Sequence, residues 1–378
     1  MHYKLLLNFI FNFSYRFGKL GLLLLDKVKK KEYLPRVYTC FFTLISPFYA
    51  SLRDTLSPFL RAYRTGLEIG QHQTTAVSAI SFCNFSFFSG NCLENVKEFM
   101  DEYNSSEIEK SHFFSFYQAV LNLMDENTED PGSLIGDVFN CERCFDEGKE
   151  YDIARVSVIC CVMSYLFHDY NAALQYAEIC RPVANCLGLM YIYRIYLFYD
   201  SLISLYFARL YEQDTKWISK AKENISKLRP LVESAQINHQ NKVMLLEAEL
   251  AIVEQRHDQV VSCYQQAISL SNKQGFPNEE AMSNERFGVY CLQQGSMQNA
   301  TEHLVNAYKC YRVWGARSKM KFLTKTYPFI SENLKDDKSS SASYFDLELQ
   351  DRSQASVISD ISSVSGKKKI PAKKRGKK

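Results

Sequence analysis

The sequence predicts an all-α fold in which antiparallel helix pairs stack into an α-solenoid. Three observations support this prediction. Two stretches towards the carboxyl end repeat the same order of small and large residues forty positions apart. The 378 residues contain 15 glycines and 9 prolines, so few positions would interrupt a helix. Hydrophobic residues make up 46% of the chain, which is enough to bury the faces between stacked helices.

The forty-residue repeat is clearest between residues 247 and 328. The small residues Ala248 and Ala267 recur as Gly288 and Ala307. A small residue in the first helix, followed by an alanine and a larger apolar residue in the second, is the tetratricopeptide pattern, and it lets two helices approach closely. The predicted repeat-packing residues are Ala248, Tyr264, Ala267, Gly288, Gly295, Ala300, Leu304, Ala307, Trp314 and Gly315.

The amino-terminal segment is the most apolar part of the chain. Residues 5–13 and 20–25 are strongly apolar, but Lys4, Asn12, Arg16 and Lys19 interrupt them. No window reaches the roughly 20 apolar residues that a membrane span needs. We therefore expect residues 1–33 to form apolar helices in a buried hairpin, with a membrane-associated or signal segment as the alternative.

Helical periodicity continues through the middle of the chain. A helix is expected from Leu34 to the region of Pro47, and Pro58 fits the first turn of the next one. A proline that lacks an N–H should also end a helix at Pro230. Further helices are expected over residues 74–88, 105–125, 156–167, 172–186, 191–211 and 217–230.

Weaker copies of the hairpin pattern occur earlier in the chain. Gly90, Asn95 and Phe99 have the same spacing as three residues of the clear repeat, Gly295, Ala300 and Leu304. Ala173 and Ala177 place small residues on one face of another predicted hairpin. The repeat domain is therefore predicted to extend over residues 34–330.

The net charge of +3 arises from the carboxyl-terminal tail. Residues 335–378 contain eleven Lys or Arg against six Asp or Glu, and the rest of the chain contains 34 against 36. The body therefore has no basic excess that would point to nucleic acid. The twelve cysteines, in a chain without an evident secretory signal, indicate reduced thiols in a cytoplasmic or nuclear protein.

Residues 331–378 are predicted to form a disordered tail that is first serine-rich and then lysine-rich. Its basic end also fits a nuclear import signal or a nucleic-acid contact. The residues of this import signal are Lys367, Lys368, Lys369, Lys373, Lys374 and Arg375.

The sequence offers little for catalysis or cofactor binding. It contains no P-loop and none of the sequence motifs of a protein kinase. Cys141 and Cys144 have the spacing of a zinc half-site, but no second Cys or His pair accompanies them. We therefore expect no enzyme activity, no cofactor and no bound metal.

Some peptide-binding tetratricopeptide domains hold the terminal carboxylate of a peptide through lysine, asparagine and arginine on the first helix of each repeat. Here Leu245, Glu249, Glu285 and Val289 occupy the comparable positions. Carboxylates and apolar side chains would not bind a carboxylate, so this mode of recognition is disfavoured. Other peptide grooves remain open.

Several stretches resemble one family, the large hybrid signalling proteins that join a serine/threonine kinase, an AAA-type ATPase and a histidine kinase in one polypeptide. Those proteins contain a long tetratricopeptide-like helical region. The similarity covers roughly residues 34–328, and the segment at residues 307–319 is its most specific part. The stretches that carry it are residues 63–70, 274–281, 284–285, 307–319 and 327–328.

This resemblance implies a helical interaction module whose catalytic domains are absent. The expected function is a non-catalytic scaffold or regulatory module in signal transduction that binds a protein or peptide, and no small-molecule substrate or membrane contact is expected. A truncated fragment of an ATP-binding kinase polypeptide, acting only with its missing domains, is the first alternative. A nuclear or nucleic-acid-associated factor that uses the basic tail is the second.

Overall fold

The computed structural model describes residues 2–105, 113–211 and 214–336. These residues form α-helices joined by turns, 3₁₀ helices and one longer segment at residues 125–140, without a β-strand, so the all-α prediction is confirmed. Within them no helix is both long and apolar enough to cross a bilayer. Residues 1–334 pack as one unit, and the import-signal residues from Lys367 to Arg375 lie outside the described residues.

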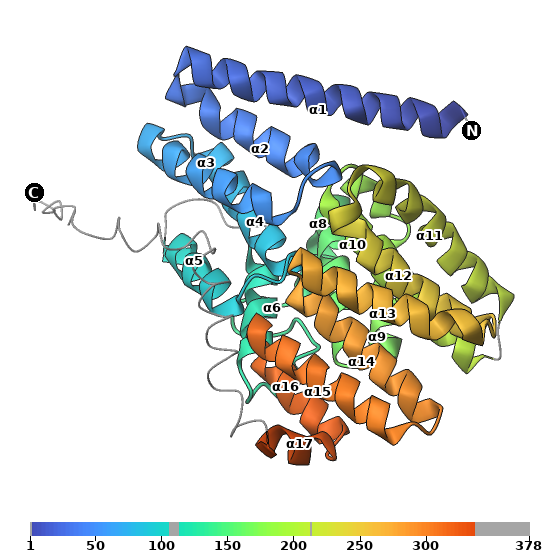
Figure 1. Cartoon of the computed structure of the whole chain (residues 1–378). Helices are drawn as coiled ribbons and strands as arrows, with labels where there is room; N and C mark the ends of the chain where they lie inside the picture. The colour runs from blue at the N-terminus through green and yellow to red at the C-terminus, as the bar shows by residue number, and fades with distance from the viewer. Residues whose placement is uncertain (1, 106–112, 212–213, 337–378) are drawn as a thin grey trace, which may run out of the picture. The chain divides into compact units, whose positions relative to one another are not determined.

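The helices follow one another closely along the chain (Figure 1). The first half contains α1 (His2–Val28), η1 (Lys31–Tyr33), α2 (Leu34–Leu44), η2 (Ser46–Phe48), η3 (Arg53–Thr55), α3 (Leu56–Ile69), α4 (His72–Phe88), α5 (Leu93–Ser105), α6 (Phe114–Met124), α7 (Cys141–Glu147), α8 (Glu150–Leu166), α9 (Tyr170–Cys180) and η4 (Ala184–Leu187). The second half contains α10 (Tyr191–Leu210), α11 (Thr215–Ser234), α12 (Gln236–Val253), α13 (His257–Gln274), α14 (Pro277–Gln293), α15 (Met297–Trp314), α16 (Arg317–Thr326) and α17 (Ile330–Asp336).

Consecutive helices pack against each other in pairs. The most extensive contacts join α3 to α4, α8 to α9, α10 to α11, α12 to α13 and α14 to α15 (Figure 1). Alternate helices also touch, because α10 contacts both α8 and α12, and α12 contacts α14. From α8 to α15, each pair therefore contacts the next one along the chain.

The same backbone turn ends many of these helices. In this turn, a residue with positive φ follows the helix, and its N–H donates to the carbonyl of the residue three positions before it. The N–H of the following residue donates to the carbonyl five positions before itself. This pair of bonds defines a Schellman turn. Gln255 and Gly295 occupy this position forty residues apart, so the repeat seen in side chains extends to the backbone. The residues in this position are Gly70, Gly90, His168, Gln255, Gly275, Gly295 and Gly315.

Gly288 shows why the repeat needs a small residue in its first helix. A Cβ atom on Gly288 would lie 2.8 Å from Leu304 Cγ and 3.3 Å from the carbonyl oxygen of Ala300. The glycine therefore lets α15 approach the backbone of α14. The other side chains of the predicted repeat-packing set are buried, namely Ala248, Tyr264, Ala267, Ala300, Leu304, Ala307 and Trp314.

Hydrogen bonds also join helices that are distant in the sequence. Arg317 Nε and Ser318 Oγ donate hydrogen bonds of 2.9 and 3.0 Å to the carbonyls of Met124 and Leu123, at the carboxyl end of α6. Lys319 Nζ donates to the Leu166 carbonyl at the end of α8. An array whose repeats contact only their neighbours would not make these bonds. We call these bonds from α16 to α6 and α8 the closure contacts.

A second long-range connection joins α12 to the segment between α2 and α3. The fully buried Asn238 donates hydrogen bonds of 2.8 and 2.7 Å to the carbonyls of Pro47 and Ala50, and its side-chain oxygen accepts one of 3.1 Å from the N–H of Leu52. One amide side chain thereby satisfies three backbone groups of a segment that is neither α-helix nor strand.

Three local expectations are wrong. The amino-terminal segment is one helix, α1, and not a hairpin, because no turn residue separates its apolar stretches and helical spacing continues through Gly18 and Gly21. The helix that contains Pro230 continues to Ser234, since a proline in the last turns removes a single hydrogen bond. The helix expected over residues 172–186 ends at Cys180 and gives way to η4.

Replacing Gly288 by valine should destabilise the fold by about 1–3 kcal/mol, because the added side chain meets Leu304 and the Ala300 backbone. Gly21→Ala is the matched control, since nothing lies within 4 Å of its added Cβ in the middle of α1, and it should stabilise by up to about 1 kcal/mol. Urea unfolding followed by circular dichroism measures both. Equal stability of the two variants would contradict the close approach of α14 and α15.

Candidate functional site

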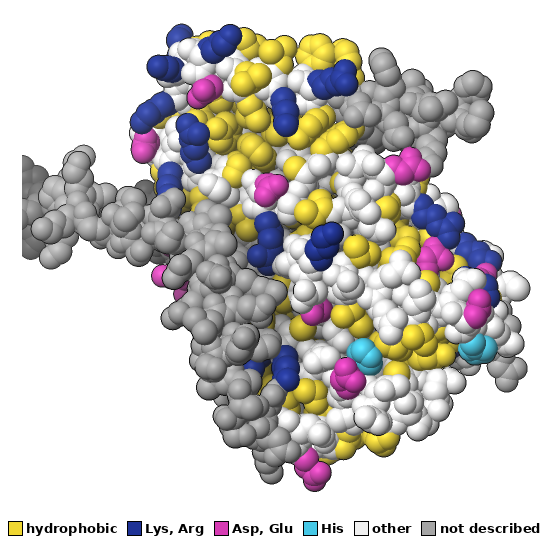
Figure 2. Space-filling view, in the orientation of Figure 1, with side chains coloured by type: hydrophobic (Ala, Val, Ile, Leu, Met, Phe, Trp, Pro, Cys, Tyr) yellow, Lys and Arg dark blue, Asp and Glu magenta, His cyan; other side chains and the backbone are white. Residues whose placement is uncertain are grey.

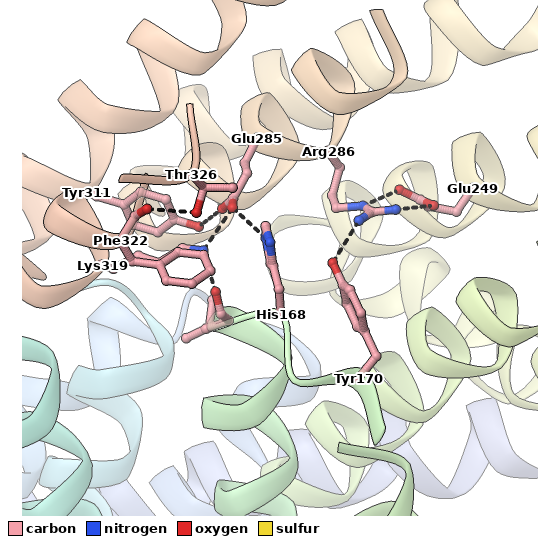
Figure 3. A network of polar contacts seen from close by, with 10 residues as sticks. His168, Tyr170, Glu249, Glu285, Arg286, Tyr311, Lys319, Phe322 and Thr326 are labelled. Carbon is pink, nitrogen blue, oxygen red and sulfur yellow. Dashed lines mark hydrogen bonds and ion pairs between the residues drawn. The ribbon is translucent and has the colours of Figure 1, made fainter. Parts of the chain in front are cut away.

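A group of buried charges lies where α14, α15 and α16 meet the turn between α8 and α9 (Figure 3). Glu285 Oε1 is 2.8 Å from Lys319 Nζ and 2.8 Å from His168 Nε2. Tyr311 Oη donates a 2.7 Å hydrogen bond to the other carboxylate oxygen. Glu285 and Lys319 are buried, so this carboxylate connects four chain segments away from solvent.

A second carboxylate, on α12, is neutralised by two arginines. Arg286 Nε and Nη2 lie 2.8 and 3.1 Å from the two oxygens of Glu249, and Arg209 Nη1 lies 2.8 Å from Glu249 Oε2. Tyr264 Oη donates a further hydrogen bond of 2.7 Å. Arg286 also bonds to the hydroxyl of Tyr170, which starts α9, so the two clusters adjoin (Figure 3). We call both together the polar hub.

A third buried pair continues the same arrangement. Lys242 Nζ on α12 lies 2.6 Å from Glu279 Oε1 on α14, and it also donates to the carbonyl of Asn238 at 2.9 Å. Asn241 donates to the other oxygen of Glu279. Neighbouring inner helices are thus joined by successive ion pairs, each with hydrogen bonds that occupy the remaining oxygens.

The pKa shifts agree with this pairing. Burial alone would raise the pKa of Glu249, but Arg209 and Arg286 lower it to about 2. Burial also opposes ionisation of Glu285, whose pKa is nevertheless lowered well below its ordinary value by Lys319 and His168. Desolvation and the nearby Lys319 lower the pKa of His168, and its hydrogen bond to Glu285 only partly opposes them. Both carboxylates are therefore ionised at neutral pH.

This arrangement positions helices and offers no open face to a substrate. Leu245, Glu249 and Glu285 are buried, although tetratricopeptide domains that bind peptides would expose these positions to the ligand. Glu249 and Glu285 instead neutralise cations of the same chain. The inner surface of α12 and α14 is thus occupied by the protein's own side chains.

An open depression lies elsewhere in the described part of the chain. It has a volume of ≈ 740 Å³ and is formed by the end of α6, the segment that follows it, Lys97 of α5 and Arg317 of α16. Its lining combines apolar side chains such as Leu121 and Ile135 with the acidic Asp125 and Asp137. We call this depression the α6 cleft. Its mixture of apolar surface and charges of both signs suits a peptide segment.

Cys141 and Cys144, which have the spacing of a zinc half-site, do not belong to a metal-binding group among the described residues. Cys141 is buried and Cys144 is half-buried, both as free thiols. Among residues 2–105, 113–211 and 214–336 no group of three or more His, Cys, Asp or Glu side chains could hold a metal ion. A hydrogen bond with Cys160 lowers the pKa of Cys141 to about 7, with burial opposing the shift.

Sequence reasoning did not find the polar hub. The partners of Glu285 are 34 and 117 residues away, at Lys319 and His168, so no local spacing signals the contact. The available signal was the charged pair Glu285 and Arg286 among residues that otherwise pack the repeat. Comparison with protein-family models and with curated proteins finds no match to this chain.

The ion pair between Glu285 and Lys319 can be tested with a double-mutant cycle. Glu285→Gln leaves the buried Lys319 charge uncompensated and should destabilise by about 3–5 kcal/mol. Lys319→Met should have a similar effect, and the double variant should cost clearly less than the sum. Denaturant unfolding measures all three. The exposed pair Lys31 and Glu68 is the control, and there the same two substitutions should change stability little. Additive losses at the buried pair would refute the coupling.

The fold should lose stability on acidification in two steps. In the unfolded chain, a histidine takes up a proton near pH 6.5. In the folded chain, the lowered pKa values of His168 and His239 delay this uptake to lower pH. The free energy of unfolding therefore decreases as the pH is lowered from about 6.5. Each histidine contributes at most about 1.4 kcal/mol per pH unit. Below about pH 4.5 the stabilisation from Glu249 and Glu285 is lost as well.

Chemical unfolding at pH 7.5 and 5.5 checks the first step. His168→Asn should reduce the difference between the two stabilities, because asparagine tolerates the positive φ of this position and does not titrate. His257→Asn changes an exposed side chain and should leave the difference as it is. A His168→Asn protein with the full acid sensitivity would exclude His168 as its source.

Proposed function

We propose that this chain is a non-catalytic protein-interaction module, built as an α-solenoid of antiparallel helix pairs, that acts as a scaffold or regulatory element in signal transduction. The observation that carries the proposal is the α6 cleft. It is open, has a volume of ≈ 740 Å³, and presents apolar and charged side chains together. An extended segment of a partner protein is its proposed occupant.

The burial of the inner helices supports this location. Helical arrays commonly bind partners on the concave surface, but here the inner positions of α12 and α14 are filled by the polar hub. A partner would instead meet exposed apolar surface at the α6 cleft, where Ile135 is 48% exposed. The cleft lining also contains charges of both signs, Lys97 and Arg317 with Asp125 and Asp137, which would favour a segment of complementary charge.

The assignment to signal transduction rests on the resemblance of residues 307–319 to hybrid signalling proteins. In the structure this segment forms the end of α15 and the start of α16, including Gly315 with its positive φ and the closure residue Lys319. The segment that carries the resemblance thus includes Lys319, which bonds α16 to the end of α8. The kinase and ATPase activities of that family are proposed to lie outside this chain.

Affinity capture with cross-linking, using the full chain as bait, tests the proposal. Ile135→Asp combined with Val138→Asp adds two charges to the α6 cleft, and recovery of a specific partner should fall by roughly tenfold or more. The matched control is Val261→Asp with Met297→Asp, which adds the same charge at exposed positions of α13 and α15. The purified partner should then show the same difference in calorimetric titration.

Two results would contradict the proposed function. Equal recovery of every partner by the wild type, the cleft variant and the control would exclude the α6 cleft as the interaction site. ATP turnover by the purified chain at an enzyme-like rate would instead show that it is catalytic.

A further inference from the structure

Helix α1 has two different faces in its second half. One face packs on the body, where Tyr15 stacks on Phe41 and Tyr49 with ring centroids 5.9 and 4.4 Å away. Gly18 lies directly against the ring of Phe41 and has no room for a side chain. The helix is therefore held in place by α2 and the segment that follows it.

The opposite face is apolar and exposed. Phe17, Leu20, Leu24 and Val28 follow one another at spacings of three and four residues, which puts them in one line along the helix. Their exposed fractions are 56, 48, 52 and 53%. We call these four residues the α1 stripe. Figure 2 shows yellow apolar side chains together with dark-blue basic ones along the edge of the molecule where α1 lies.

Basic side chains border the α1 stripe. Residues 13–31 contain six lysines and arginines and a single acid, Asp26. Lys30 and Lys31 pair with Glu32 and Glu68. The exposed Arg16, Lys27 and Lys29 have no acidic side chain of the described residues within ion-pair distance, so their charge is available to an anionic surface.

The charge pattern decides which occupant fits. A second copy of this chain would bring the same arginine and lysines to both sides of a two-fold contact, and like charges would repel each other. An anionic phospholipid surface supplies an apolar layer for the α1 stripe and negative headgroups for the flanking cations. We propose that α1 docks this protein onto an anionic phospholipid surface, with the stripe inserted at the level of the headgroups.

This proposal differs from the expectation that the protein makes no membrane contact. That expectation came from interpreting the apolar stretches as a buried hairpin, whereas α1 is one helix with an exposed stripe. It also goes beyond the proposed function, because the α6 cleft and the α1 stripe share no residues.

Vesicle co-sedimentation of the full chain tests it. The wild type should bind vesicles of phosphatidylcholine with phosphatidylserine, bind pure phosphatidylcholine weakly, and lose binding as salt is raised. Phe17→Asp with Leu24→Asp should weaken binding to the anionic vesicles by roughly tenfold or more. The triple variant Arg16→Gln, Lys27→Gln and Lys29→Gln should also bind the anionic vesicles more weakly. Its weak binding to pure phosphatidylcholine should be unchanged.

The control variant Val261→Asp with Met297→Asp carries the same added charge away from α1 and should bind vesicles like the wild type. Thermal melts confirm that each variant is folded, which is expected because the substituted side chains lie at the surface. The α6 cleft variant should also bind vesicles normally, so failure of this proposal and failure of the proposed function remain distinguishable.

Four outcomes would overturn the proposal. The wild type could fail to sediment with anionic vesicles, or the Phe17→Asp with Leu24→Asp variant could bind them as well as the control. Light scattering could also reveal a dimer that this variant abolishes while no vesicle binding occurs, in which case a second copy covers the α1 stripe. Capture of an acidic protein helix by the stripe, again without vesicle binding, would have the same consequence.

Discussion

The ion pair between Glu285 and Lys319 lies where α14 and α16 meet the end of α8. Lys319 is the third residue of α16, and its ammonium group also donates to the carbonyl at the end of α8. A cation at the carboxyl end of a helix is favourable because the last carbonyls are unpaired. The charge is completely buried, however, and without Glu285 the cost of desolvating it would not be offset.

The same requirement explains the composition of the interior. Stacked pairs of helices can be held together by apolar packing alone, as Gly288 and Leu304 show. The inner helices additionally carry Glu249, Glu279 and Glu285, each matched by a cation from another helix. Such pairs contribute little net stability compared with apolar side chains of similar size, but they disfavour any arrangement in which a charge is left unpaired. These ion pairs therefore favour the one packing of the helices in which every buried charge has its partner.

The sequence predicts the local elements much better than the way they connect. The all-α class and the forty-residue register follow from small residues at fixed spacing, because these positions are determined by neighbouring helices. The hairpin expected in place of α1 is wrong because apolar content alone does not indicate where a helix turns. Residues of the candidate site depend on contacts across 34 to 195 positions, such as Glu285 with Lys319 and Ser318 with Leu123, and these have no signature in a single sequence.

The closure contacts also limit how this architecture can change in evolution. Helical repeat proteins usually lengthen and shorten by duplication or loss of whole repeats, since each unit meets only its neighbours. Here one more hairpin between α8 and α14 would carry Lys319 away from the Leu166 carbonyl and Glu285 away from His168. Because Asn238 also ties the segment between α2 and α3 to α12, these contacts disfavour gain or loss of a hairpin anywhere between that segment and α16.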